Sequence, residues 1–182
     1  KNISLVLGKG VFRGESVMWM ARWCLYEAVT TLRGAQAAVA GAAAKLEEGK
    51  GKKRTTVLAA QIGALACLAM NARNCIMYNY ALSIADQTQF GPNPMDYDDN
   101  ILYDQRALTM RKIAREELDN TSELIALLKN TDGRVLHHAH TDEEESVFVL
   151  PVDLVGALKR KTEVMLEHWQ DYEELYPATK VW

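Results

Sequence analysis

Residues that cross-link or interrupt a chain are scarce in this sequence, which has three cysteines and four prolines in 182 residues. The cysteines, Cys24, Cys67 and Cys75, are odd in number and form no Cys-x-x-Cys pair. They therefore predict neither a disulfide framework nor covalent haem attachment. Unpaired cysteines are typical of a reducing compartment, so we expect a cytoplasmic protein.

The sequence also lacks a large excess of positive or negative charge. The chain carries 21 Lys and Arg against 24 Asp and Glu, a net charge of −3. Binding to nucleic acid leaves a basic stripe or patch as its footprint, and the basic residues here alternate with acidic ones. We expect no nucleic-acid partner.

Long runs of strongly apolar residues are absent as well. The longest uncharged stretch, residues 55–72, is rich in alanine and interrupted by Gln61, Gly63 and Asn71. A membrane span needs about 20 predominantly apolar residues. The stretch predicts a buried core helix and no membrane partner.

Motifs for catalysis and cofactor binding are missing too. There is no P-loop, GxGxxG, GxSxG or HExxH. A di-metal bundle needs Glu and Glu-x-x-His on its helices, but residues 55–86 hold neither Glu nor His, and His168 has no Glu three residues before it. We expect no metal and no cofactor, and the sequence indicates no catalytic residues.

Helical periodicity is what the chain does contain. Four patterns recur at helical spacing, over residues 15–48, 54–87, 101–129 and 151–176. Glycine, proline or Asn-rich connections separate them. They predict one all-α domain over residues 1–182, an antiparallel up-down four-helix bundle with a run-in segment at 1–14 and a tail at 177–182.

Apolar seams predict which helix faces are inner. The third helix has one at Ala107, Met110, Ala114, Leu118, Thr121, Ile125 and Leu128. The fourth has a strict heptad at Val155, Leu158, Thr162, Met165, Trp169, Tyr172 and Tyr176. We expect Trp169 to be largely buried against the second or third helix.

Three histidines, His137, His138 and His140, precede an acidic run. Two of them could share a face toward a metal ion. However, Thr141 followed three residues later by Glu144 is a capping box. We interpret the segment as a solvated loop with one helical turn and no metal.

Polar residues within the apolar second helix raise the main functional question. Asn71 and Asn74 share a face, and Tyr78 follows one turn later. They predict either a ligand pocket between the first and second helices, which Trp19 and Trp23 would complete, or hydrogen bonds between helices that set their register. The Trp19–Trp23 ridge is itself typical of a core or a subunit interface.

We therefore expect a helical-bundle association domain with no catalytic constellation of its own. It would be either a subunit of a homo-oligomer or the helical domain of a larger enzyme, covalently linked to a neighbouring domain. The segment before residue 17 resembles a run-in from something preceding. The alternative is a small-ligand-binding bundle, an enzyme or a sensor, with the pocket described above.

Overall fold

The computed structural model describes residues 20–89, 110–131, 135–146 and 150–170. It is mostly helical (80%), with four helices and no strands in this part of the chain. The prediction of an all-α fold is confirmed. The elements are η1 (a π-helical turn, Met20–Leu25), α3 (Tyr26–Ala44), α4 (Lys50–Gln89), α6 (Met110–Asn130), η2 (a 3-10 turn, Glu144–Ser146) and α7 (Leu154–Glu167).

The break between the first two helices falls earlier than predicted. The N–H groups of Lys45 and Leu46 donate to carbonyls three residues back, on Ala42 and Ala43, so the last turn of α3 tightens and the helix ends at Ala44. The next helix already begins at Lys50. The predicted run-in, most of the connection predicted between the second and third helices and the C-terminal tail lie outside the described residues.

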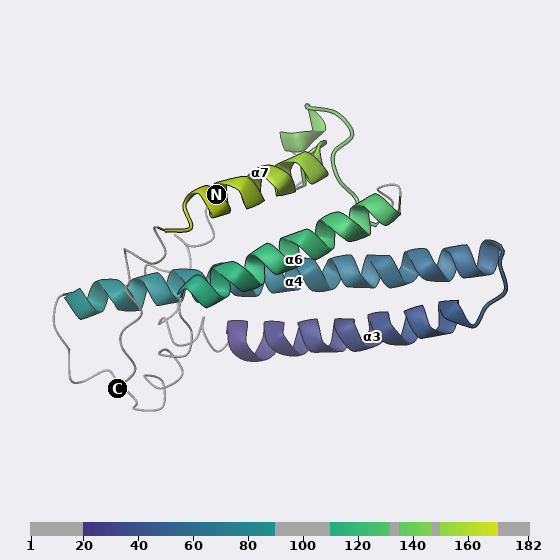
Figure 1. Cartoon of the computed structure of the whole chain (residues 1–182), viewed down its shortest axis with the longest axis horizontal. Helices are drawn as coiled ribbons and strands as arrows, with labels where there is room; N and C mark the ends of the chain where they lie inside the picture. Colours follow the sequence, from purple (N-terminus) through teal and green to yellow (C-terminus); the bar gives the residue numbers. More distant parts are fainter. Residues whose placement is uncertain (1–19, 90–109, 132–134, 147–149, 171–182) are drawn as a thin grey trace.

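Successive helices pack against one another: α3 against α4, α4 against α6, and α6 against α7 (Figure 1). The first pair approaches closely at Gly63 of α4, where a Cβ atom would lie 2.5 Å from Nε2 of Gln36 on α3. The Gln36 side chain occupies the space that a methyl group at position 63 would need, which explains why a glycine stands there.

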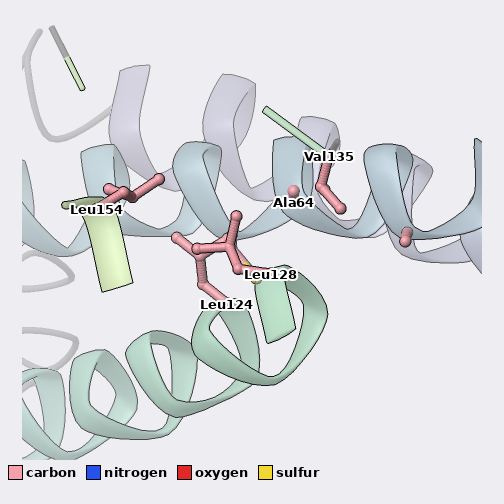
Figure 2. Close-up of a cluster of buried hydrophobic side chains, with 7 residues drawn as sticks. Ala64, Leu124, Leu128, Val135 and Leu154 are labelled. Carbon is pink, nitrogen blue, oxygen red and sulfur yellow. The ribbon is translucent and has the colours of Figure 1, made fainter. Parts of the chain in front are cut away.

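A cluster of buried apolar side chains joins α4, α6 and α7 (Figure 2). α4 contributes small residues and α6 contributes leucines, so that large side chains fit against a smooth helix. The cluster comprises Ala60, Ala64, Cys67, Leu124, Leu128, Val135 and Leu154. This cluster packs the three helices together, and three of its members, Cys67, Leu124 and Leu154, also line the cavity beside the polar groups described below.

The last helix starts three residues later than the predicted Pro151. The Asp153 side chain accepts a 2.7 Å hydrogen bond from the N–H of Gly156 and caps the helix. The predicted seam is half-buried at Val155, Leu158, Thr162 and Met165, while Leu154 is the residue of α7 that is fully buried.

Trp169 lies partly buried against α6, the third predicted helix, but not at the core position expected from the heptad seam. The helix ends at Glu167, and Trp169 is half-buried beyond that end. The guanidinium groups of Arg111 and Arg115 on α6 lie 5.9 and 5.2 Å from its ring centroid. Trp169 therefore forms cation–π contacts with two arginines of α6 and does not occupy a core site.

Within the described residues one helix is long and apolar enough to cross a membrane by length and composition. It is the Lys50–Tyr78 part of α4, with a mean hydropathy of 1.5 in a window of which 33% is buried. A core helix passes the same test, so this is weak support for a span. A third of that window is buried, and the helix exposes Leu58 and Leu65.

Candidate functional site

A buried carboxylate on α6, Glu117, links three helices. Its Oε1 accepts a 2.6 Å hydrogen bond from Asn71 Nδ2 and its Oε2 a 2.7 Å bond from Asn74 Nδ2, both on α4. The Lys161 ammonium of α7 forms an ion pair with Oε1. A buried charge is tolerated only when it is paired and hydrogen-bonded. The two amides of α4 and the ammonium group of α7 provide these hydrogen bonds and this charge pairing.

The Asn74 amide is satisfied on both sides. While its Nδ2 donates to Glu117, its Oδ1 accepts a 3.1 Å bond from Arg73 Nη1, which also lies 3.1 Å from Oε2 of Glu116. Asn74 is itself 2% exposed. The carboxylates of two successive α6 residues are thus bound by one face of α4.

A second ion pair joins α3 to α6. Arg33 binds Glu123 through both guanidinium Nη atoms, with Nη2 2.6 Å from Oε2 and 3.6 Å from Cys67 Sγ. Burial lowers the pKa of Arg33, but the hydrogen bond and charge of Glu123 outweigh it, so the pKa is raised and the guanidinium stays charged. Arg33 is therefore held toward the inside of the helix layers.

The Cys67 thiol next to this pair is fully buried, and we expect it to be unreactive at neutral pH. Burial raises its pKa to about 11, and the nearby Glu123 charge acts in the same direction, against the opposing effect of Arg33. A thiol must be deprotonated to act as a nucleophile or metal ligand. Cys67 consequently serves as a packing residue at neutral pH.

Beside Glu117 lies a cavity of about 260 Å³ between α4, α6 and α7. Asn71, Glu117, Asn120, Thr121 and Lys161 line its polar part, and leucines line much of the rest. Asn120 is 6% exposed and donates through Nδ2 to the carbonyl oxygen of Cys67, at 3.0 Å. Among the described residues its Oδ1 has no hydrogen-bond partner.

The five residues singled out from the sequence are only partly brought together. Asn71 and Asn74 converge on Glu117, and Tyr78 is half-buried one turn further along α4. Trp23 is 51% exposed in η1, and Trp19 lies outside the described residues. Of the five, Asn71 lines the cavity, which borders α6 and α7. Ligand binding by the five together stays a prediction.

Glu117, Asn120 and Lys161 were missed from the sequence. A signal for the first was present, since Glu117 lies three residues after Ala114 and four before Thr121, two members of the predicted α6 seam. Leu118 occupies the corresponding place in that predicted seam but is only half-buried, whereas Glu117 is buried. The inner face of α6 is thus rotated by about one residue, because the amides of α4 bind the carboxylate.

The histidine segment contains the predicted helical turn. Glu144 N donates to Thr141 Oγ1 at 3.4 Å, and Glu144 Oε2 accepts from His140 N at 2.8 Å. The His140 ring lies 5.7 Å from that of His137 and 5.5 Å from that of His138, between centroids. Over the described ranges no group of three or more His, Cys, Asp or Glu is placed to hold a metal. The absence of metal stays a prediction.

Comparison with known proteins reveals no relative: no family model, curated protein or solved structure matches the chain significantly. Any function therefore has to follow from the geometry of the described residues.

Proposed function

We propose that the chain is an association domain, a single antiparallel up-down four-helix bundle over residues 1–182 that binds a second copy of itself in the cytoplasm. The surface concerned is the outer side of α3 and α4. The observation that carries the proposal is that this surface is exposed, while its exposed charged residues are confined to the start of each helix, at Glu27 of α3 and at Lys50, Lys53 and Arg54 of α4. The alternative is that a neighbouring domain on the same polypeptide packs against this surface.

The outer surface of α3 has no charged residue over most of its length. Arg33 is the one charged residue in 28–44, and it is half-buried and bound to Glu123. The exposed positions hold threonine, alanine and glycine. They are Thr30, Thr31, Gly34, Ala35, Ala37, Ala38, Ala40, Gly41, Ala42 and Ala44. A helix face without charges is unusual for one that meets water alone.

Two glycines on this surface support close approach by another molecule. A Cβ atom added at Gly34 or Gly41 would meet nothing within 4 Å, in contrast to Gly63, which has Gln36 against it. Glycine in a helix interior costs about 1 kcal/mol relative to alanine. No packing within the described residues offsets that cost. Close packing against a partner helix would offset it.

Exposed leucines extend the surface onto α4. Leu58 and Leu65 lie seven residues apart, hence on one face, and are 47% and 49% exposed. Two helices of α3's length, about 28 Å at 1.5 Å per residue, present a strip of roughly 28 by 20 Å when they pack about 10 Å apart. That strip of about 560 Å² amounts to roughly two thirds of the ~800 Å² that each partner buries in a stable interface.

A second copy suits this surface better than lipid does. A lipid-facing helix needs about 20 predominantly apolar residues, and α3 interrupts its apolar character with Thr30, Thr31, Arg33 and Gln36. Alanine and glycine give little transfer free energy into lipid but permit close contact between helices. The three free cysteines of the described residues suit a reducing compartment.

Sedimentation equilibrium over a range of concentrations tests the proposal. We expect a dimer that Leu65→Glu converts to monomer, because a carboxylate would have to be buried in the interface. The matched control is Leu166→Glu, which changes an equally exposed leucine (56%) on α7 and should leave the dimer intact. A wild-type chain that is monomeric throughout, or that partitions into lipid vesicles, overturns the proposal.

A further inference from the structure

Asn120, which lines the cavity between α4, α6 and α7, has one buried polar atom for which the described residues offer no partner. Asn120 Nδ2 donates to the Cys67 carbonyl oxygen at 3.0 Å, and this bond sets the orientation of the amide. Flipping it would place two oxygens against each other. Oδ1 is therefore the atom left without a donor. Such an acceptor destabilises the protein unless a water or ligand completes it.

The charges that line the cavity cancel. Glu117 and Lys161 are its charged lining residues, and they form an ion pair. Both oxygens of Glu117 already accept hydrogen bonds from Asn71 and Asn74. A charged ligand would lose its hydration without a free counter-charge to replace it. The electrostatics thus favour a neutral ligand.

The remaining wall of the cavity is apolar. It includes Leu68 of α4, Leu124 of α6, and Leu154 and Leu158 of α7. Its volume of about 260 Å³ lies just below the ~300–1,000 Å³ usual for ligand pockets. The ligand that fits is smaller than a drug-sized molecule and has an aliphatic body.

We propose that this cavity binds a small neutral amphiphile, whose hydroxyl group donates a hydrogen bond to Asn120 Oδ1 while its aliphatic chain lies against the leucines. Lys161, which also lines the cavity, has N–H donors beyond the one bound to Glu117 and could bind the hydroxyl oxygen. The site is separate from the α3–α4 surface. Its occupancy does not depend on the association described above.

Two isomers test the proposal with matched size. 1-Hexanol and 1-methoxypentane have the same atoms, but the ether has no donor. We would titrate each into the full chain and follow the side-chain amide resonance of Asn120 by NMR. The expected result is saturable binding of hexanol, with the ether about tenfold weaker, the factor that corresponds to one hydrogen bond. Hexanoate and hexylammonium should bind more weakly than hexanol.

Variants locate the binding. Asn120→Leu removes the acceptor at similar volume and should abolish the preference for the alcohol over the ether. Leu158→Trp should fill the cavity and prevent binding of both probes, whereas Leu166→Trp, an exposed position on the same helix, should not. The wild-type isomer ratio and the tryptophan pair suffice if Asn120→Leu does not fold.

Three outcomes overturn the proposal. The first is equal affinity for the two isomers, which would show that Asn120 is not the recognition group. The second is hexanol binding that Leu158→Trp leaves unchanged. The third is no binding of hexanol up to its solubility limit, in which case Oδ1 is completed by a bridging water only.

Discussion

Replacing the Glu117 carboxylate by an amide, Glu117→Gln, probes the polar centre of the fold most directly. Glutamine keeps the shape and one acceptor oxygen, which can still receive Asn71. Its NH₂ group, however, meets the Nδ2 of Asn74, which is 2% exposed. Asn74 then has a buried donor without an acceptor.

The magnitude follows from the burial of each partner. The unsatisfied Asn74 donor costs about 1–3 kcal/mol. Loss of the Lys161 ion pair adds at most about 1 kcal/mol, because that ammonium is 32% exposed and can turn to solvent. The expected destabilisation of about 1–4 kcal/mol is a substantial part of the ~5–15 kcal/mol by which domains are stable.

Urea unfolding followed by far-ultraviolet circular dichroism measures the change. With a denaturant dependence of about 2 kcal/mol/M, the midpoint should fall by roughly 0.5–2 M. The control is the same substitution at Glu123 on the same helix. That side chain is 42% exposed, so the Arg33 pair is worth at most about 1 kcal/mol. Equal midpoints for the two variants would refute the view that Glu117 is the buried centre of the network.

Four further predictions concern separate features. The Cys67 thiol should react with iodoacetamide only on unfolding, while the exposed Cys24 reacts in the native state. Since the folded pKa of Cys67, about 11, exceeds its ordinary value of 9.0, the stability this thiol contributes is complete below pH 9 and is lost as pH rises to 11. The loss should be on the order of 2–3 kcal/mol, and Cys67→Ala should remove this part of the pH dependence. Trp169→Ala should cost about 1–2 kcal/mol, since its ring is half-buried under two arginines, and Gln170→Ala less than about 0.5 kcal/mol; equal denaturant midpoints would contradict this. Gly41→Ala should raise the stability of the monomer by up to about 1 kcal/mol yet weaken self-association, as measured by thermal melts and sedimentation of the same variant. Finally, EDTA should leave the melting temperature unchanged. A structural zinc at His138 and His140 would contribute about 10 kcal/mol or more, so its removal would lower the melting temperature strongly and contradict this prediction.

The helices themselves follow from the sequence because their periodicity is local. Asn71 and Asn74 are three residues apart in an apolar run, and that spacing alone predicts that they share a face. Their acceptor, Glu117, lies 46 and 43 residues further along the chain. Periodicity reports how a helix is oriented with respect to its own core, so it cannot name a partner on another helix.

Helix ends and rotations were harder to predict for a similar reason. Residues 45–48 are ordinary helix formers, so nothing before Gly49 indicates that α3 stops at Ala44. The hydrogen bonds that tighten its last turn appear only in three dimensions. On α6, the rotation that buries Glu117 instead of Leu118 reverses the order that hydrophobicity predicts, because three donors from other helices stabilise the carboxylate.

The contacts of Glu117 also bear on the order in which the chain folds. α3 and α4 are joined by five residues, 45–49, so they can pair early at a low entropic cost of loop closure. Glu117 meets Asn71 across 46 residues and Lys161 across 44, so its carboxylate is fully paired only after both α6 and α7 have docked. We therefore expect the α3–α4 hairpin to form first and the docking of the last two helices onto it to be slower. Until α6 and α7 dock, such a hairpin would present both its outer surface and the side that packs against the leucines to other copies of the chain, so we expect aggregation to be most pronounced at this stage.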